Sequence, residues 1–221
     1  MFDIEILRFL KELGKNNKRE WFELNKAKYL KSKKSFEDFV LELIKIIKSI
    51  DPSIGMPEPK DCIFRIHRDV RFSKDKSPYK TNFGAYISRG GKKSSFAGYY
   101  FHIEPNEIFL SGGIYMPSGP VLKAVREAIF DDPETFKKIL NDPNFKKYFP
   151  ELAGEKLKTF PQGYPKNHPD IDLIKYTSYY VYRPIDEKIL TSSNLPEEIR
   201  KTFTQLKPFN DFLNNAIEHL S

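Results

Sequence analysis

The sequence is poor in the residues that build covalent cross-links and metal centres. It contains one cysteine, Cys62, and four histidines among 221 residues. A single cysteine excludes an internal disulfide and any zinc site with several cysteine ligands. The histidines form neither a His-x-His pair nor an HExxH motif, and we therefore predict neither a metal site nor a cofactor.

Long apolar runs are also missing. No uncharged apolar stretch approaches the roughly 18 residues that a membrane span needs. The apolar segment 4–13 is interrupted by two acidic and two basic residues, so we expect no signal peptide. Together with the lone cysteine, this pattern favours a protein of the reducing cytoplasm without a membrane partner.

The excess positive charge lies in one segment. The chain has 37 basic and 30 acidic residues, a net charge of +7. Residues 60–93 contain ten basic and three acidic residues, which is also a net +7, whereas the other 187 residues contain 27 of each sign. Concentrated positive charge attracts anions more strongly than the same charge spread evenly. A solvated basic loop would have the same composition, and the sequence leaves both interpretations open.

Apolar residues with helical spacing mark both ends of the chain. We expect N-terminal helices over 2–13, from residue 18 onward, and over 36–47. Asn16 and Asn17 offer N-cap oxygens for the second of these helices. Helices are expected again over 120–129, from 133, from 143 to 148, and from 195, where Pro208 kinks or splits the last one.

The middle of the chain alternates with a period of two, which predicts β-strands. The expected strands cover 62–67, 83–88, 99–104 and 107–115, with a fifth at 178–183. Short connections between the first four favour an antiparallel meander, with an exposed hairpin tip at residues 90–93. We therefore predict one α+β domain over residues 1–221, with N-terminal helices, a central mainly antiparallel sheet and C-terminal helices.

The segment 64–82, FRIHRDVRFSKDKSPYKTN, carries the candidate binding chemistry. Arginine forks bind phosphate and carboxylate groups, and lysines add point charges. No glycine lies between Gly55 and Gly84, so a phosphate here would be held by side chains and not by a Walker loop. The predicted anion-binding residues are Arg65, Arg68, Arg71, Lys76, Tyr79 and Lys80.

Three residues are candidates for acid–base catalysis: Asp69, His102 and Glu104. For Asp69 the interleaving of acidic and basic residues favours the alternative role, an ion-pair partner of a neighbouring arginine. In a meander, Arg65 and His67 would share a polar sheet face with His102 and Glu104, and that face would either line a pocket or be solvated. His102 and Glu104, joined by His67 or Asp69, have the donor types of a metal site, although no spacing motif supports one. Side chains from the helices would wall such a pocket: Trp21, Asn25, Tyr29 and Arg126.

The segment FRIHRDVRFSKDKSPYK resembles the signature of a widespread, mostly bacterial family, domain of unknown function 2461. Further stretches are similar in the expected order, including NNKREWFELNKAKY at 16–29, GYYFHIEPNE at 98–107 and FPQGYPKNHP at 160–169. The resemblance covers nearly the whole chain and implies a single α+β domain of this length. It implies no activity.

Three functions fit these observations. The first is a protein that binds or acts on a small phosphate- or carboxylate-bearing ligand through residues 65–80. The second is a nucleic-acid-binding module, which a pI of about 9.2 and abundant aromatic residues favour. The third is a non-catalytic structural or interaction protein in which the basic segment is an internal ion network. We favour the first, and the sequence indicates neither a reaction class nor an oligomeric state.

Overall fold

The computed structural model describes residues 2–71 and 73–220. The expected N-terminal helices are present as α1 (Glu5–Lys15), α2 (Arg19–Leu24) and α3 (Lys26–Ile50), followed by the short helices η1 (Pro52–Ile54) and α4 (Pro59–Cys62). The predicted N-cap of α2 is wrong, because Lys18 occupies that position and no side chain caps the helix. The Asn17 carboxamide instead bonds to the backbone of Tyr79.

Four antiparallel strands form the sheet in the order β1-β2-β3-β4. Their bounds are β1 (Phe83–Ile87), β2 (Gly98–Glu104), β3 (Glu107–Ile114) and β4 (Tyr179–Pro184). These strands confirm four of the five predicted strands and the mainly antiparallel arrangement. Because side chains alternate along each strand, directly paired residues share one face of the sheet.

The predicted strand at 62–67 is wrong. Cys62 is the last residue of α4, a short helix that begins at Pro59. In the described structure, the residues that follow it form only isolated β-bridges, between Ile63 and Ala85 and between His67 and Tyr79. Cys62 and Ile63 are adjacent and both buried, so burial does not alternate as it would in a half-buried strand. The alternation in sequence therefore did not correspond to a sheet strand.

The remaining helices follow the sheet and end the chain. They are α5 (Gly119–Asp131), α6 (Pro133–Asn141), α7 (Pro143–Tyr148), α8 (Ile171–Ile174), η2 (Glu187–Thr191), α9 (Leu195–Ile217) and η3 (Glu218–Leu220). Pro208 does not split the last long helix, and α9 continues through it. Burial of Leu206 and Phe209 on either side of Pro208 stabilises the helix where the proline removes a backbone hydrogen bond. Among the described helices, none is long and apolar enough to cross a lipid bilayer.

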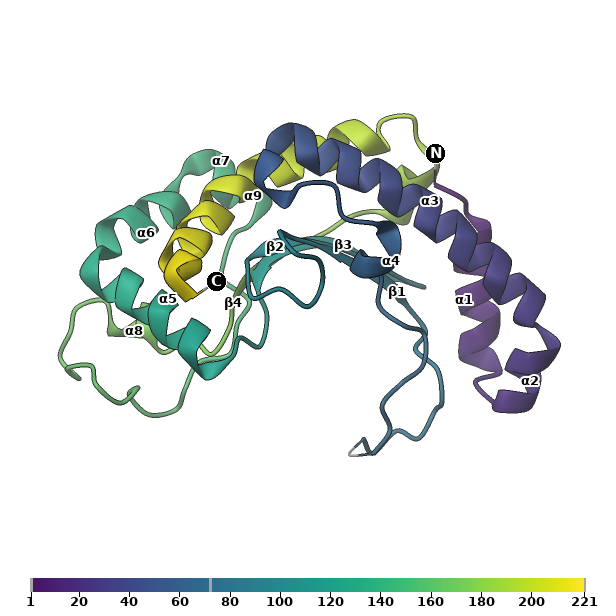
Figure 1. The fold of residues 1–221 in the computed structure, drawn as a ribbon, viewed down its shortest axis with the longest axis horizontal. Coiled ribbons are helices and arrows are strands. Elements are labelled where there is room, and N and C mark those ends of the chain that lie inside the picture. Colours follow the sequence, from purple (N-terminus) through teal and green to yellow (C-terminus); the bar gives the residue numbers. More distant parts are fainter. Residues whose placement is uncertain (1, 72, 221) are drawn as a thin grey trace.

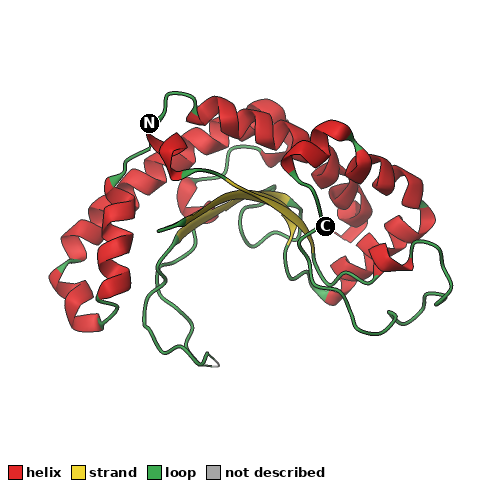
Figure 2. Ribbon diagram, turned by 180° about the vertical axis from the view of Figure 1, so that it is seen from behind, coloured by secondary structure: helices red, strands yellow, loops and turns green. Residues whose placement is uncertain are grey.

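The helices form an arch over one face of the sheet (Figure 1). α3 and α9 cross above the strands, α1 and α2 lie at one end of the arch, and α5 to α8 lie at the other; the view from behind shows the same layers (Figure 2). The covered face is apolar, as the close packing of Phe36, Phe83 and Phe101 shows. The opposite face of the sheet is turned away from α3 and α9.

α9 approaches the sheet at Gly112. A Cβ atom there would lie 2.2 Å from Leu206 Cδ2 and 2.5 Å from the carbonyl oxygen of Gly98. Both distances are far below van der Waals contact, so only glycine permits this approach of helix to strand. The helical layer is thereby fixed on one side, and the other face is left to form a site.

Candidate functional site

A recess of about 680 Å³ lies on the sheet face opposite α3 and α9. Each of the four strands contributes lining side chains, since Tyr86, Tyr100, Ser111 and Tyr180 all point to this face. The walls come from the connection between β1 and β2, from the start of α5 and from the basic segment. The aromatic and histidine lining residues are Phe64, Tyr86, Phe96, Tyr100, His102, Phe109, Tyr115 and Tyr180.

The floor of the recess is held by hydrogen bonds from tyrosine and serine hydroxyls to backbone carbonyls. Tyr86 Oη lies 2.8 Å from the carbonyl oxygens of both Phe96 and Gly113. Ser111 Oγ donates to the carbonyl oxygen of Val181 at 2.6 Å. Burial raises the pKa of Tyr86 above its ordinary value, so its hydroxyl stays protonated and acts as a donor. The floor is therefore preorganised before any ligand arrives.

His102 is stacked and hydrogen-bonded within this floor. Its ring is nearly parallel to that of Phe109, with centroids 4.5 Å apart, and its Nδ1 lies 3.0 Å from Tyr100 Oη. Tyr100 reaches His102 across Gly84, where a Cβ atom would lie 2.3 Å from the tyrosine hydroxyl. Burial lowers the pKa of His102 despite the opposing effect of Glu104, so the ring is predominantly neutral at pH 7.

Lys80 brings positive charge to the recess. Its Nζ lies 5.6 Å from the centre of the Phe64 ring, and both side chains line the recess. Among the described residues, Lys80 has no carboxylate partner within ion-pair distance. Burial lowers the pKa of Lys80, and the neighbouring Arg65 and Arg68 lower it further. An anion placed here would relieve an existing repulsion between cations.

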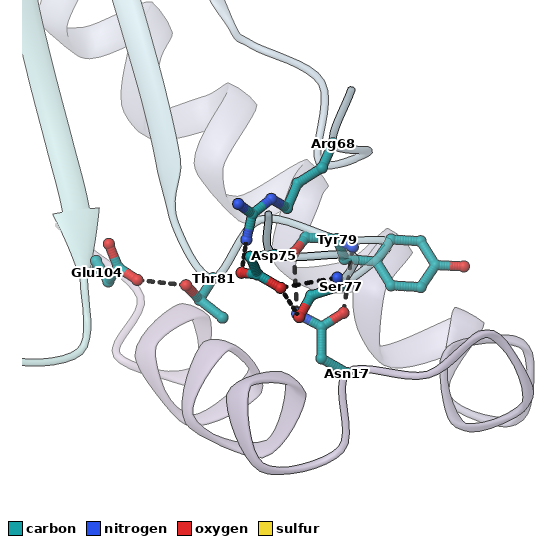
Figure 3. A network of polar contacts seen from close by, with 7 residues as sticks. All are labelled: Asn17, Arg68, Asp75, Ser77, Tyr79, Thr81 and Glu104. Atoms are coloured by element: carbon teal, nitrogen blue, oxygen red, sulfur yellow. Dashed lines mark hydrogen bonds and ion pairs between the residues drawn. The ribbon is translucent and has the colours of Figure 1, made fainter. Parts of the chain in front are cut away.

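Two of the predicted anion-binding arginines have acidic partners of their own. Arg71 forms a two-pronged ion pair with Asp69, at 2.7 Å and 3.0 Å, and Arg68 bonds to Asp75. The bonds from Arg71 lower the pKa of Asp69 to about 2. The bonds from Ser77 and, to a smaller extent, from Arg68 lower the pKa of Asp75 to about 2. Figure 3 shows the Arg68–Asp75–Ser77 cluster beside Tyr79. The candidate catalytic residue Asp69 is thus a hydrogen-bonded partner of Arg71.

The other predicted residues fall in different places. Lys76 donates to the carbonyl oxygen of Val70 at 2.9 Å, and Tyr79 is buried against Phe22, with ring centroids 3.9 Å apart. A second, smaller pocket of about 390 Å³ is lined by Lys76, Tyr79, Arg68 and His67. Neither pocket is lined by Arg65 or Arg71. Of the predicted site residues, Lys80 and His102 therefore both line the larger recess.

The expected sharing of one sheet face by Arg65, His67, His102 and Glu104 does not occur, because residues 64–67 lie outside the sheet strands. His67 packs against Phe22 and Tyr79 instead. Glu104 follows His102 on its strand and accepts a hydrogen bond from the Thr81 hydroxyl (Figure 3).

The helical residues expected to wall a pocket contribute elsewhere. Trp21 and Tyr29 pack on Phe9, and Asn25 donates to the carbonyl oxygen of Trp21. Arg126 donates to the carbonyl oxygen of Tyr176 at 2.9 Å. These side chains join elements of the helical layers and do not line the recess.

The predicted exposed tip at residues 90–93 is only partly exposed. Gly91 is buried, and Lys92 donates its backbone N–H to the carbonyl oxygen of Asp61 and its Nζ to the carbonyl oxygen of Lys60. The loop therefore folds back on α4, because its backbone finds hydrogen-bond partners there. This places Lys92, Ser94 and Phe96 in the wall of the recess.

Several recess residues were not singled out from the sequence. Phe109 and Tyr86 lie on strands that were predicted, on the face that alternation leaves polar or aromatic. Phe109 is two residues from Ser111, and Tyr86 is two residues from Gly84, so each pair shares a strand face. This spacing was the signal in the sequence that could have placed them on the face of the recess. Phe96 and Tyr115 lie in loops. The spacing of apolar residues in a sequence does not predict the path of a loop, so their place in the lining could not be foreseen.

Comparison with known proteins gives a family. Neither the search of curated proteins nor the search of solved structures found a match. A family model described as conserved hypothetical protein (DUF2461) matches residues 5–212, which include the sheet, the recess and the basic segment. The chain therefore belongs to the DUF2461 family of conserved hypothetical proteins.

Proposed function

We propose that the protein binds a small ligand that combines a flat apolar or aromatic ring with a phosphate or carboxylate group. The observation that carries this proposal is the position of Lys80, a cation without a carboxylate partner among the described residues, in an aromatic-lined recess of about 680 Å³. Recesses of roughly 300–1,000 Å³ with mostly apolar walls and a few polar groups are typical of small-molecule sites. The aromatic floor would stack on the ring, and Lys80 would attract the anion.

Two further features support an anionic ligand. Lys92 lines the same recess and has no carboxylate partner among the described residues. The first turn of α5 also borders the recess through Ser118 and Val121, and it contains no acidic residue. The free N–H groups at a helix N-terminus favour negative charge. Lys80, Lys92 and the N-terminus of α5 would therefore all contribute positive electrostatic potential to the recess.

Adenosine monophosphate is a suitable probe because it has both a planar ring and a phosphate. Isothermal titration calorimetry should detect binding to the full chain, with weaker binding of adenosine and of inorganic phosphate alone. Lys80→Met keeps the apolar stem and removes the charge, and we expect it to weaken binding by about tenfold or more. The matched control is Lys74→Gln, an exposed cation of the same segment that does not line the recess.

Binding of adenosine monophosphate weaker than millimolar, or an equal loss in both variants, would refute the proposal. An equal loss would mean that the net charge of the segment acts without the recess.

A second candidate, single-stranded nucleic acid, is favoured by the exposed tyrosines beside the recess. Tyr182 is 48% exposed and Tyr115 is 68% exposed, and aromatic side chains on a sheet face stack with unpaired bases. A fluorescent oligonucleotide should then bind with an affinity that falls steeply with salt. Binding that depends on Tyr182 more than on Lys80 would favour this candidate over the small ligand.

A further inference from the structure

The turn between β2 and β3 brings together three side chains with metal-ligand donors. Nitrogen and oxygen atoms of His102, Glu104 and Glu107 all lie within 4.8 Å of one another. The register produces this cluster, because Glu104 and Glu107 are paired across the hairpin and His102 precedes Glu104 by two residues on the same face. Asn106 makes the tight turn possible by adopting a φ of 70°.

The two glutamates of the cluster face each other without a basic partner. Directly paired like charges destabilise a sheet unless a cation lies between them. Among the described residues, no lysine or arginine forms an ion pair with either carboxylate, and the neutral ring of His102 lies beside Glu104, with Nε2 3.6 Å from Glu104 Oε2. This arrangement contrasts with the many lysine–glutamate pairs on the helices, such as Lys123–Glu127. A bound cation would relieve the repulsion.

The histidine of the cluster has an unused ring nitrogen. His102 Nε2 is buried in a side chain that is only 12% exposed, and it makes no hydrogen bond within 3.5 Å in the described structure; its close neighbour Glu104 Oε2 lies just beyond, at 3.6 Å. Buried polar atoms are nearly always hydrogen-bonded, so an exception calls for an explanation. Metal ligation through Nε2 would satisfy this atom.

The residues around the cluster can orient its ligands. Tyr100 Oη, 3.0 Å from Nδ1, can accept the Nδ1 proton, which leaves the Nε2 lone pair free. Asn82 lies 3.5 Å from the same nitrogen and can offer its amide oxygen by rotation. The Thr81 hydroxyl donates to Glu104 Oε1 and leaves Oε2 directed toward His102. Such outer contacts are typical of metal sites.

We propose that His102, Glu104 and Glu107 bind a divalent first-row transition metal ion at the end of the β2–β3 hairpin. One imidazole and two carboxylates suit Zn²⁺ or Mn²⁺ better than Mg²⁺ or Ca²⁺, which prefer oxygen ligands alone. In a tetrahedral zinc site, neighbouring donor atoms are about 3.3 Å apart for bond lengths near 2.0 Å. The 3.6 Å between His102 Nε2 and Glu104 Oε2 is close to that separation.

The proposed metal site would adjoin the recess, because His102 belongs to both. Three protein ligands leave one tetrahedral position for water or another ligand. The inference does not depend on the ligand proposed for the recess, and its test uses the metal alone.

The test is a calorimetric titration of the full, metal-stripped chain with Zn²⁺ at neutral pH. We expect one equivalent to bind and to shift the ¹⁵N resonance of His102 Nε2. Glu107→Gln changes an exposed side chain, so the fold should survive, and it should weaken Zn²⁺ binding by at least about tenfold. Tyr100→Phe should weaken it by roughly ten- to a hundredfold, by removing the acceptor for the Nδ1 proton.

Glu151→Gln is the matched control, since Glu151 is an exposed glutamate outside the cluster. It should leave the affinity for Zn²⁺ unchanged. Failure of 100 µM Zn²⁺ to bind, or an affinity that Glu107→Gln does not alter, would overturn the site. Mg²⁺ bound as tightly as Zn²⁺ would overturn the assignment to a transition metal.

Discussion

Asn17 holds the backbone of Tyr79 with both ends of its carboxamide. Its Nδ2 donates to the Tyr79 carbonyl oxygen at 2.9 Å, and its Oδ1 accepts from the Tyr79 N–H at 3.1 Å (Figure 3). The next residue, Lys80, donates its N–H to the carbonyl oxygen of Ile66 at 2.7 Å. The connection between α1 and α2 thus fixes the backbone from which Lys80 reaches the recess.

Replacement of Asn17 by alanine should lower the free energy of unfolding by about 1–3 kcal/mol, because two partly buried backbone groups of Tyr79 lose their partner. Urea denaturation followed by circular dichroism measures this change. Asn16→Ala is the control, since the Asn16 carboxamide donates only to the exposed carbonyl oxygen of Glu12. Its effect should stay within about 0.5 kcal/mol. Similar losses in the two variants would contradict the role given to Asn17.

Gly112→Ala should be strongly destabilising. The added methyl group would collide with Leu206 Cδ2 and with the backbone oxygen of Gly98, which cannot move without breaking the sheet. We expect a loss of about 3 kcal/mol or more in chemical denaturation. Gly119→Ala provides the comparison, because no heavy atom lies within 4 Å of a Cβ placed there. A stable Gly112→Ala variant would show that α9 does not pack closely on β3.

Arg65→Gln should raise the pKa of Lys80. Burial contributes most to the lowered pKa of Lys80, and the nearby guanidinium of Arg65 contributes next. Since the charged form is disfavoured in the folded state, the charge on Lys80 costs stability at neutral pH. This cost begins to fall as the pH reaches the lowered folded-state pKa, and it disappears above the unfolded-state pKa. Lysine side-chain NMR titration measures the shift. An unchanged or lower pKa in Arg65→Gln would contradict this account.

The same reasoning predicts that Lys80→Met is at least as stable as the natural protein at pH 7. Its loss of ligand binding would then be due to the missing charge and not to unfolding. Thermal denaturation at pH 7 decides this, and a clear fall in the midpoint would contradict the expectation.

Ser77→Ala should raise the pKa of Asp75, because it removes the bond from the Ser77 hydroxyl while the bond from the Ser77 N–H remains. The bonds from the Ser77 hydroxyl and N–H are the largest causes that lower this pKa to about 2, and Arg68 contributes less. Because the folded-state pKa lies below the unfolded value of about 3.9, the stabilisation is complete above that pH and is lost as the pH falls to about 2. Carboxyl ¹³C NMR titration measures this pKa, and an unchanged value in Ser77→Ala would contradict the role given to the hydroxyl.

Most of the fold could be predicted from local patterns. The helical periodicity of Phe36, Val40 and Ile44 corresponds to the buried side of α3, and the alternation around Phe101 corresponds to β2. The failure at residues 62–67 has a local cause, since Pro59 starts a short helix and both Cys62 and Ile63 are buried. Alternation over so few residues does not distinguish a strand from an irregular covering segment.

The candidate site was only partly predictable. The sequence predicted Lys80 and His102, which both line the recess, but it did not single out Phe109 and Phe96. Adjacency in the sequence did not predict which aspartate each arginine binds. Arg68 does not pair with the adjacent Asp69 but bonds to Asp75, seven residues away. Glu107 joined the cluster with His102 only through the pairing of β2 with β3.

The sequence by itself determined the helical and strand periods, the antiparallel succession of strands and the concentration of positive charge in residues 60–93. These properties depend on residues close together in the chain. Only the tertiary structure decided which cations are neutralised by aspartates and which cations line an aromatic recess. The reason is that contacts between distant segments, such as the bonds from Asn17 to the Tyr79 backbone, set the course of the basic segment and thereby the direction of its side chains.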